Sequence, residues 1–418
     1  MKRIMIFFFF FSALCFSQQK PLSDDQLQLP ALHLPDVLQI PGGSLISDTV
    51  EWQKKARPAL LSIFETEVYG YMPRKKLKTR YITRSVTVNA MNGLAVRKEL
   101  VIRLSAKRKQ RDIDVLMYLP MSISGPVAVF LGLNFCGNHC IHPDSSITMA
   151  HSWMADKYIQ EKNQELVTSR GIQASRWPVE QILERGYGLV TVYYGDLYPD
   201  YPGGESESVL PLLDLPVSDA KTGAIGIWAW GLSLVMDCLV NDREIDPSRV
   251  FVIGHSRLGK AALWAAANDT RFAMAISNNS GCGGAKIFRH NFGESVEIIT
   301  TKFPHWFCNN FKKYNGREDA LPVDQHQLLA LIAPRPVYIA SASDDANADP
   351  AGELLAALNV APVYRLYQKQ TLPLSVLPPV NTPFITQIGY HLRQGKHDIT
   401  PWDWQRFLDF ADQHFGNR

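Results

Sequence analysis

A serine lies between a predicted strand and a predicted helix, in the stretch VFVIGHSRLGKAALW at residues 250–264. This stretch differs by one residue from two known motifs, the phosphate-binding loop G-x-x-x-x-G-K-[ST] and the nucleophile elbow G-x-S-x-G. Ala261 stands where the phosphate loop needs a magnesium-binding hydroxyl, which disfavours that interpretation. We therefore interpret Ser256 as a candidate nucleophile, with Gly254 before it and Gly259 three residues after it. A structural serine at a tight turn is the alternative.

A nucleophilic serine needs a histidine base, and the base needs an orienting carboxylate, in the chain order Ser, acid, His for an α/β-hydrolase. Downstream of the elbow, the apolar run RPVYIASAS leads into DDANADP, which offers Asp344, Asp345 and Asp349. The later stretch GYHLRQGKHDITPWDW offers two histidines before a predicted C-terminal helix. His397 lies in a polar loop and is the expected base, whereas His391 lies in a strand-like stretch where it can simply pack. This order favours the nucleophile elbow.

Composition and the N-terminus indicate an exported globular protein. The chain has 418 residues, of which 46% are hydrophobic and 20% charged, with a formal net charge of +3. Lys2 and Arg3 supply two of these charges, so the balance favours neither nucleic acid nor an anionic membrane as a partner. They precede an apolar run at residues 4–16 that is too short to span a bilayer. We expect a signal peptide at residues 1–17, with a lipoprotein anchor at Cys15 as the rival interpretation.

The mature protein is expected to be secreted or periplasmic, with no membrane segment left after cleavage. Residues 18–45 are rich in Pro, Gln, Leu and Asp and predict an extended arm. Residues 46–418 contain no repeat, low-complexity run or linker, so we expect one catalytic domain there. Five cysteines remain after cleavage, an odd number, so at least one is free or pairs between molecules. They are Cys136, Cys140, Cys238, Cys282 and Cys308.

Two of these cysteines lie close together in the sequence. Cys136 and Cys140 are near enough to form a disulfide, and His139 and His142 beside them are residue types that bind zinc. A C-x-x-x-C pattern without a second pair of ligands is a weak metal signal, so we interpret the cysteines as structural. The predicted chemistry needs neither a metal nor an organic cofactor.

The apolar pattern predicts an α/β fold. Residues 50–71 suit a helix, because apolar side chains recur there at helical spacing. These side chains are Trp52, Ala56, Leu60, Ile63 and Val68. The alternating stretches TRSVTVNA and AVRKELVIRL predict an antiparallel strand pair. Six short runs follow, rich in Val, Ile and Tyr, as is typical of a mostly parallel sheet covered by helices on both faces. These runs are DVLMYLP, PVAVFLGLN, YGLVTVYYG, RVFVIG, FAMAISN and RPVYIASAS.

Several stretches resemble the glucuronoyl esterases of carbohydrate esterase family 15, specifically their bacterial branch. They run from about Trp52 to the C-terminus and include FETEVYGYMP, FLGLNFCGNH, YYGDLYPD, GHSRLGKAALW, SNNSGCGGA, FPHWF and GYHLRQGKHD. The pattern G-x-S-R-x-G-K is specific to the elbow of that family and explains the displaced Gly259. The resemblance implies an α/β-hydrolase fold, a three-layer sandwich whose mostly parallel central sheet carries an antiparallel N-terminal strand pair.

The resemblance also implies a secreted serine esterase that hydrolyses esters of (4-O-methyl-)glucuronic acid, as in the linkages between lignin and glucuronoxylan. A monomer that acts on glucuronoxylan or on lignin–carbohydrate esters is then expected, without a cofactor. One rival is an esterase of the same fold that acts on acetylated xylan or pectin methyl esters. The other is a non-catalytic carbohydrate-binding homologue.

Carried over by matching motifs, Ser256 would be the nucleophile, His397 the base, and Arg257 a cation that supplements backbone N–H groups at the oxyanion. A surface salt bridge is the alternative for Arg257. The family pattern acid-x-Trp-Ala-Asp-Pro places the acid at Asp345, with Asp344 as the runner-up.

Three further positions match contacts to the uronate, and two depart from the family. Lys260 and Glu294 match residues that bind the ring hydroxyls, although Lys260 could be solvated and Glu294 could cap or pair structurally. Trp306 would form part of the sugar platform, but an aromatic among aromatics is more often core. Asn279 stands where some members carry a catalytic glutamate, so the acid must come from the later strand. Asn347 replaces a tryptophan near the substrate, which puts substrate preference in doubt.

Overall fold

The computed structural model describes residues 29–40, 43–74, 77–106, 108–158, 169–213, 215 and 218–416. The predicted signal peptide and residues 18–28 of the predicted arm lie outside these residues. The described part of the arm lies along the core without forming a helix. It is held there in part by the Pro35 carbonyl, which accepts a hydrogen bond from His326 Nε2 at 2.8 Å.

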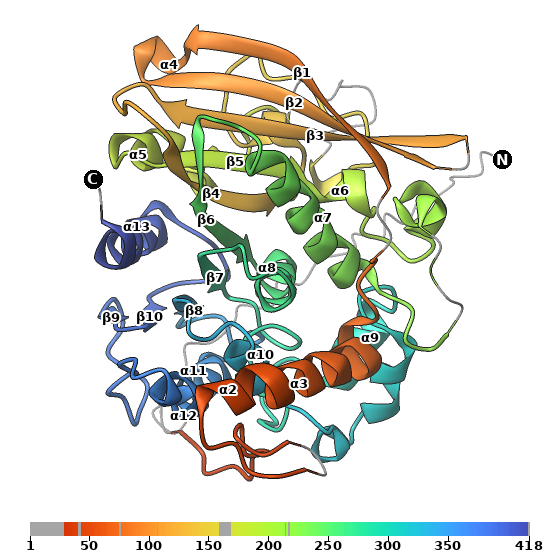
Figure 1. The fold of residues 1–418 in the computed structure, drawn as a ribbon, viewed down its shortest axis with the longest axis vertical. Coiled ribbons are helices and arrows are strands. Elements are labelled where there is room, and N and C mark those ends of the chain that lie inside the picture. Colours follow the sequence, from red (N-terminus) through yellow and green to blue (C-terminus); the bar gives the residue numbers. More distant parts are fainter. Residues whose placement is uncertain are drawn as a thin grey trace, which may run out of the picture.

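Ten strands of the described chain form a single sheet in the order β1-β2-β3-β5-β4-β6-β7-β8-β10-β9 (Figure 1). The neighbours from β5 through β4, β6, β7 and β8 to β10 all pair in parallel, which confirms the predicted α/β class. The strands are β1 (Lys78–Asn89), β2 (Ala95–Ala106), β3 (Lys109–Pro120), β4 (Val127–Asn134), β5 (Gly188–Tyr193), β6 (Ile245–His255), β7 (Met274–Asn278), β8 (Val337–Ala342), β9 (Phe384–Ile385) and β10 (Ile388–Arg393).

The antiparallel N-terminal region is one strand larger than the predicted pair. β1 and β2 pair as expected, but β3, which contains DVLMYLP, runs antiparallel to both β2 and β5. Only two residues separate β2 from β3, and such a short connection can join only antiparallel strands. The sequence of DVLMYLP predicts a parallel-sheet strand because its last six residues are apolar enough to be buried on both faces, and in the structure all six are buried.

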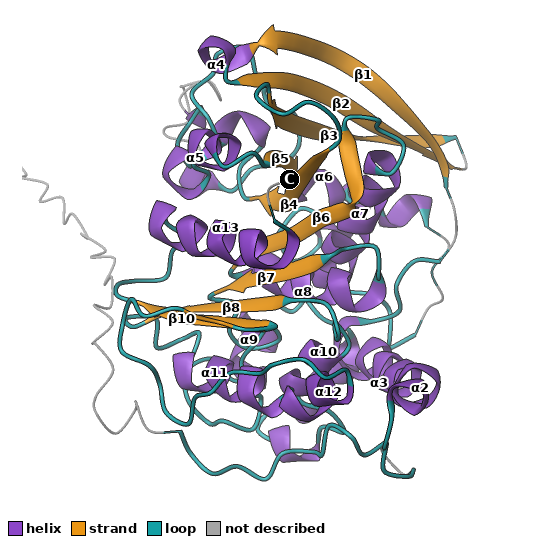
Figure 2. Ribbon diagram, turned by 60° about the vertical axis from the view of Figure 1, so that its left-hand side comes forward, coloured by secondary structure: helices purple, strands orange, loops and turns teal. Residues whose placement is uncertain are grey.

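Helices cover both faces of the sheet, as Figure 2 shows. Along β6, Val250 and Val252 join the core beneath α7, α8 and α11, whereas Phe251 and Ile253 join the core beneath α5 and α13. This alternation explains why the central strands are apolar throughout. The helices are α2 (Thr49–Glu51), α3 (Arg57–Phe64), α4 (Ala90–Gly93), α5 (Val179–Glu184), α6 (Tyr194–Leu197), α7 (Ala224–Leu239), α8 (Arg257–Asn268), α9 (Val296–Lys302), α10 (Gln325–Ala330), α11 (Pro350–Asn359), α12 (Ala361–Leu366) and α13 (Pro401–Phe415).

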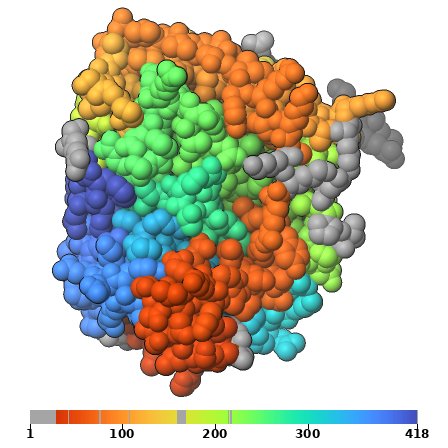
Figure 3. Space-filling view, viewed as in Figure 1, coloured from red at the N-terminus to blue at the C-terminus, as the bar shows by residue number. Residues whose placement is uncertain are grey.

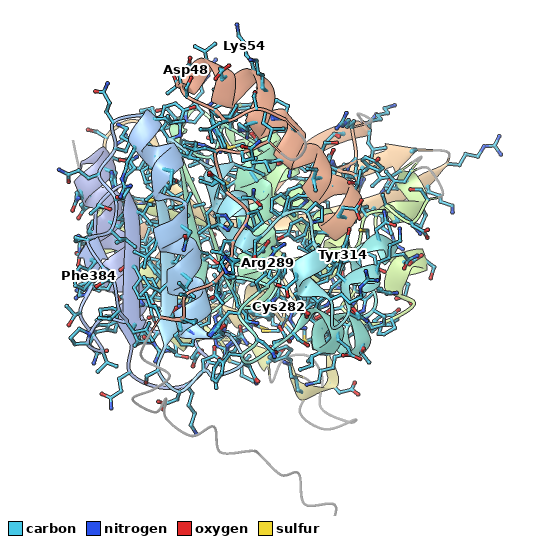
Figure 4. The ribbon with its side chains drawn as sticks, turned by 90° about the horizontal axis from the view of Figure 1, so that it is seen from below. Asp48, Lys54, Cys282, Arg289, Tyr314 and Phe384 are labelled. Carbon is cyan, nitrogen blue, oxygen red and sulfur yellow. The ribbon has the colours of Figure 1, made fainter. Side chains whose placement is uncertain are left out.

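The predicted helix at residues 50–71 forms over residues 49–69, as α2 and α3 together with two stretches of π-helix, Trp52–Ala56 and Glu65–Tyr69. It crosses the surface in Figure 3, and its outer end carries Asp48 and Lys54 in Figure 4. Phe64 is fully buried whereas Ile63 is only half-buried, contrary to the predicted spacing. The i→i+5 hydrogen bonds of the π stretches shift the buried stripe by one residue.

No helix in the described ranges is both long enough and apolar enough to cross a membrane.

The indole of Trp404 anchors α13, the helix that follows the loop carrying His397. It is fully buried, packs 5.4 Å from the Phe130 ring centroid, and donates from Nε1 to the Arg176 carbonyl at 2.9 Å. We expect Trp404→Ala to lower the free energy of unfolding by about 3–5 kcal/mol, since it leaves a cavity. Urea titration followed by circular dichroism measures this loss. Gln413→Ala, at an exposed position of the same helix, should stay within about 0.5 kcal/mol of the parent.

Candidate active site

Ser256 lies at the sharp turn that joins β6 to α8. Its backbone adopts φ 57° and ψ −130°, a strained conformation for a residue with a side chain and one typical of a nucleophile elbow. A Cβ atom on Gly254 would lie 2.0 Å from the Leu258 carbonyl oxygen, so only glycine fits there. A Cβ atom on Gly259 would lie 3.0 Å from both the Gly254 carbonyl oxygen and the Ser280 Cβ, which is also tight. The strand–turn–helix context that the sequence predicts is confirmed.

His397 and Asp345 form a hydrogen-bonded pair beside this turn. The Nδ1 of His397 lies 2.5 Å from Asp345 Oδ2, and the carboxylate is almost fully buried whereas the imidazole is 39% exposed. Asp344 accepts instead from the Ser343 hydroxyl, and Asp349 caps α11. The geometry therefore selects Asp345 as the partner of the histidine. A neutral imidazole that donates from Nδ1 keeps Nε2 as its acceptor, which is the tautomer a general base requires.

Asn279 contacts the same carboxylate. Its Nδ2 donates to Asp345 Oδ2 at 2.9 Å, so the amide contacts the acid from the position where some members of the resembled family carry a catalytic glutamate. Asn279 has φ 47° and directly follows β7. Two donors therefore converge on one oxygen of Asp345, and this arrangement fixes the orientation of its carboxylate.

A second buried carboxyl supports the loop after Asn279. Glu353 Oε1 accepts from the backbone N–H groups of Ser280 and Gly281 at 2.8 and 3.0 Å, and Oε2 accepts from the Ser341 hydroxyl at 2.6 Å. Burial raises the pKa of Glu353 to about 8, although these hydrogen bonds oppose the shift. Glu353 thus ties α11 to the wall of the site.

Two further histidines near the site, His391 and His255, are structural. His391 is fully buried on β10, with Nε2 2.9 Å from Asp403 Oδ1, and burial lowers its pKa; it packs as the sequence suggests. His255, next to the nucleophile, pairs Nδ1 with Asn278 Oδ1 at 2.6 Å. Its ring centroid lies 4.7 Å from that of His397. Burial holds the pKa of His255 well below its usual value, so it packs against His397 as a neutral ring.

Arg257 lies in the wall of the site and forms an ion pair with the buried carboxylate of Asp200. Asp200 also accepts from His305 Nε2 at 2.9 Å and from Trp306 Nε1 at 2.7 Å. The Arg257 guanidinium carbon lies 4.7 Å from the Trp306 ring centroid, within the range of a cation–π contact. Burial alone would raise the pKa of Asp200, but the His305 hydrogen bond and the Arg257 charge outweigh it and lower the pKa. The cation beside Ser256 is therefore paired, but inside the site and not on the surface.

Lys260 and Glu294 lie side by side in the wall of the pocket. Lys260 is 3% exposed, so the solvated alternative is wrong, and its ammonium donates to the carbonyls of Ser280 and Cys282 at 2.6 and 2.5 Å. Its Nζ lies 3.7 Å from Glu294 Oε2. Burial lowers the pKa of Lys260, and the Glu294 carboxylate opposes that shift. Trp306 is 3% exposed and stacks on Phe303 at 3.8 Å, so it is a core residue whose ring also lines the pocket.

All seven predicted site residues border one pocket of about 260 Å³. Asn347 also lines it and is exposed. The Ser256 side chain does not cap α8, so the positive end of this helix lies at the Ser256 turn, where it favours a developing negative charge. The lining residues are Ser256, Arg257, Lys260, Asn279, Ser280, Gly281, Glu294, Phe303, Trp306, Asp345, Asn347, Ala348 and His397.

Three polar residues of this region were missed by the sequence reasoning: Asp200, His305 and Glu353. Asp200 ends the motif YYGDLYPD and His305 lies in FPHWF, so both were within stretches that carried the resemblance. Each acts on a partner far away in the chain, and spacing could not reveal that pairing.

The five cysteines that remain after the predicted cleavage site are all unpaired, buried thiols. Cys140 Sγ lies 3.4 Å from His139 Nε2, while His142 pairs with Glu180 on the other side. Within the described ranges, no three His, Cys, Asp or Glu side chains group as metal ligands. The interpretation of Cys136 and Cys140 as structural thiols agrees with this arrangement.

Comparison with known proteins relates this geometry to a family. A family model described as glucuronyl esterase, fungi, matches residues 204–367. A curated relative named carbohydrate esterase MZ0003, from an unknown prokaryotic organism, is 43% identical over 404 residues, which covers 96% of this chain and 93% of the relative.

Two solved structures superimpose closely on the chain. A glucuronoyl esterase from Solibacter usitatus has a TM-score of 0.87 and 44% identity, and the match covers 93% of this chain and 99% of that one. A promiscuous CE15 esterase from a marine bacterial metagenome has a TM-score of 0.87 and 43% identity. This match covers 94% of this chain and 99% of that one. The chain therefore belongs to carbohydrate esterase family 15, the glucuronoyl esterases, and is a carboxylic ester hydrolase.

Proposed function

We propose that this protein is a serine esterase that hydrolyses esters of (4-O-methyl-)glucuronic acid through a Ser256–His397–Asp345 triad. The observation that carries the proposal is the hydrogen bond of His397 to Asp345 in the pocket that Ser256 also lines. A relative named 4-O-methyl-glucuronoyl methylesterase, from Podospora anserina, is 34% identical over 165 residues and supports the choice of substrate.

In the acylation step, His397 Nε2 removes the proton of the Ser256 hydroxyl as Oγ attacks the ester carbonyl carbon. Negative charge collects on the carbonyl oxygen, next to the N–H groups at the start of α8 and the Arg257 guanidinium. His397 then returns the proton to the leaving alcohol, and the uronoyl group stays on Ser256 as an ester.

In the deacylation step, water attacks the uronoyl ester while His397 takes one of its protons. The tetrahedral intermediate collapses, Ser256 leaves with the proton, and the uronic acid is released. The ionised Asp345 stabilises the imidazolium in both steps and holds the Nδ1–H tautomer between them.

Lys260 and Glu294 bind the sugar. Their charged groups lie 3.7 Å apart at the pocket wall. One ring hydroxyl can donate to the Glu294 carboxylate, and a neighbouring hydroxyl can accept the single Lys260 N–H that is not bonded to a carbonyl. Charge-assisted bonds of this kind are strong. A pocket of about 260 Å³ suits one sugar ring, with the alcohol directed to solvent. We infer that the natural ester joins lignin to glucuronoxylan.

A wider ester range is the second candidate. A promiscuous esterase of the same family covers nearly the whole chain at 43% identity. The small, exposed Asn347 borders the pocket where the resemblance leads one to expect a tryptophan, which leaves more room for the alcohol. Acetylated xylan and pectin methyl esters are the substrates to compare.

We also propose export through the signal peptide at residues 1–17, which makes the mature protein secreted or periplasmic. Residues 46–418 would then act as one catalytic domain, preceded by the arm at residues 18–45, and as a monomer. The arm follows the proposed cleavage site, so it would remain part of the mature protein, and it packs along the core from Leu29 onward.

Hydrolysis of benzyl glucuronate, methyl galacturonate and an acetyl ester by one purified preparation tests the substrate class. We expect the highest kcat/KM for the glucuronate, and loss of all turnover in Ser256→Ala with an unchanged circular dichroism spectrum. Activity on acetyl esters alone would contradict the glucuronate substrate class. Residual turnover in pure Ser256→Ala would contradict the assignment of Ser256 as the nucleophile.

Substitution of the two neighbouring acids separates the catalytic carboxylate from its rival. Asp345→Asn keeps the shape but removes the charge that stabilises the imidazolium, so kcat should fall by about 10³–10⁴. Asp344→Asn is the matched control, and its kcat should stay within a few-fold of the parent. Equal losses in the two variants would contradict the assignment of Asp345.

Glu294→Gln tests recognition of the sugar hydroxyls. Loss of a hydrogen bond to a charged group costs about 1.5–3 kcal/mol, roughly a 10- to 100-fold drop in kcat/KM for the glucuronate ester. Turnover of 4-nitrophenyl acetate, which has no ring hydroxyls, should be unchanged. Glu297→Gln, at an exposed position on α9, serves as the control. A similar loss on both esters would mean that Glu294 supports the fold and not the sugar.

A further inference from the structure

Asp200 is a buried carboxylate that lies behind the wall of the pocket. Its side chain is 2% exposed, and it does not line the pocket, whereas the Arg257 side chain is 22% exposed and does. Asp200 therefore acts on a ligand only through the pocket-lining side chains that it holds, Arg257 and Trp306. His305 Nε2 and Trp306 Nε1 both donate to Oδ1, at 2.9 and 2.7 Å, and Oδ2 binds the guanidinium. Oδ2 also accepts a hydrogen bond from the Tyr194 hydroxyl at 3.4 Å.

Aromatic rings hold the guanidinium in place from its other sides. The Phe303 and Phe135 ring centroids lie 5.5 and 5.9 Å from the Arg257 carbon, in addition to Trp306 at 4.7 Å. In the part of the chain that the structure describes, the Arg257 Nε–H is buried without a hydrogen-bond partner. The ion pair with Asp200 is therefore the contact that sets the direction of the cation.

The arginine and the lysine that line the pocket each have an acidic partner. Arg257 pairs with Asp200, and Lys260 lies 3.7 Å from Glu294. Asp200 remains ionised, because the His305 hydrogen bond and the Arg257 charge keep its pKa below the usual value in spite of burial. The cationic charges are thus balanced close to the pocket, although the Arg257 side chain stays 22% exposed and lines it.

The proposed reaction changes the charge of the sugar. The uronate ester is neutral, whereas the acid that leaves is an anion at neutral pH. An unpaired arginine beside Ser256 would bind this carboxylate as a bidentate, charge-assisted pair and retain the product. An arginine paired with a carboxylate can still donate hydrogen bonds to the oxyanion that forms during the reaction. Its electrostatic attraction for the product carboxylate is much weaker, because the partner's negative charge opposes it.

We propose that Asp200 is a positioning residue that fixes Arg257 and cancels its charge, so that the pocket admits the neutral ester and releases the uronate anion. This inference rests on the proposed function for the identity of the sugar. The balance of charge that carries it comes from contacts within this chain alone.

Direct binding of two ligands to the wild type and to Asp200→Asn tests the proposal without turnover. The ligands are glucuronate, an anion, and glucuronamide, a neutral analogue of the same size, and calorimetry gives both dissociation constants. In Asp200→Asn the amide oxygen can still accept from His305 and Trp306, but Arg257 loses its counter-charge. We expect glucuronate to bind about tenfold tighter or more, with added salt weakening the gain, while binding of glucuronamide changes little.

Asp237→Asn, which removes the carboxylate of a surface ion pair with Arg271, is the matched control and should change neither constant. Equal weakening of both ligands in Asp200→Asn would show a merely structural role and overturn the proposal, as would unchanged glucuronate binding. The wild type provides a test that does not depend on the variant's folding. If it binds glucuronate more than tenfold tighter than glucuronamide, the charge is not cancelled and the proposal fails. Wild-type hydrolysis of benzyl glucuronate separately tests the proposed function.

Discussion

The site depends on the parallel pairing of the strands at the centre of the sheet. Because β6, β7, β8 and β10 run in the same direction, their carboxyl ends meet at one edge. The loops that leave this edge carry Ser256, Asn279, Asp345 and His397 in that order. Backbone pairing holds these strands in register, so the positions of these four side chains follow from the sheet and not from the loops alone.

Much of this arrangement could be predicted from the sequence, because the signals are local. The elbow consists of an apolar strand, a tight turn and a helix within fifteen residues, and the glycines beside Ser256 mark the turn. The parallel core strands were visible as apolar runs. The acid and the histidine were placed by order along the chain, and the choice of Asp345 over Asp344 agrees with the hydrogen bond that the structure contains. The extra antiparallel strand was missed because burial on both faces gives the same pattern in either direction.

Contacts between distant residues could not be predicted in this way. Asp200 lies 57 positions before Arg257, and Glu353 lies 73 positions after Ser280, with no periodicity to connect them. Both are buried carboxylates whose partners become apparent only when the chain has folded. Their pKa values also shift in opposite directions: the His305 hydrogen bond and the Arg257 charge lower the pKa of Asp200, whereas burial raises that of Glu353 to about 8. One can therefore balance a cation, while the other serves mainly as an acceptor for backbone N–H groups.

The hydrogen bond from Asn279 to Asp345 has a consequence for how this site can change over generations. If a glutamate replaced Asn279 while Asp345 stayed, two carboxylates would face one another beside His397, and one would hold a proton at neutral pH. If Asp345 were lost first, the histidine would have no acid. Transfer of the acid between the two strands must pass through one of these poorer intermediates. With Asn279 in place, a change in the position of the acid is therefore unfavourable. Descendants of this sequence are expected to keep their acid after β8.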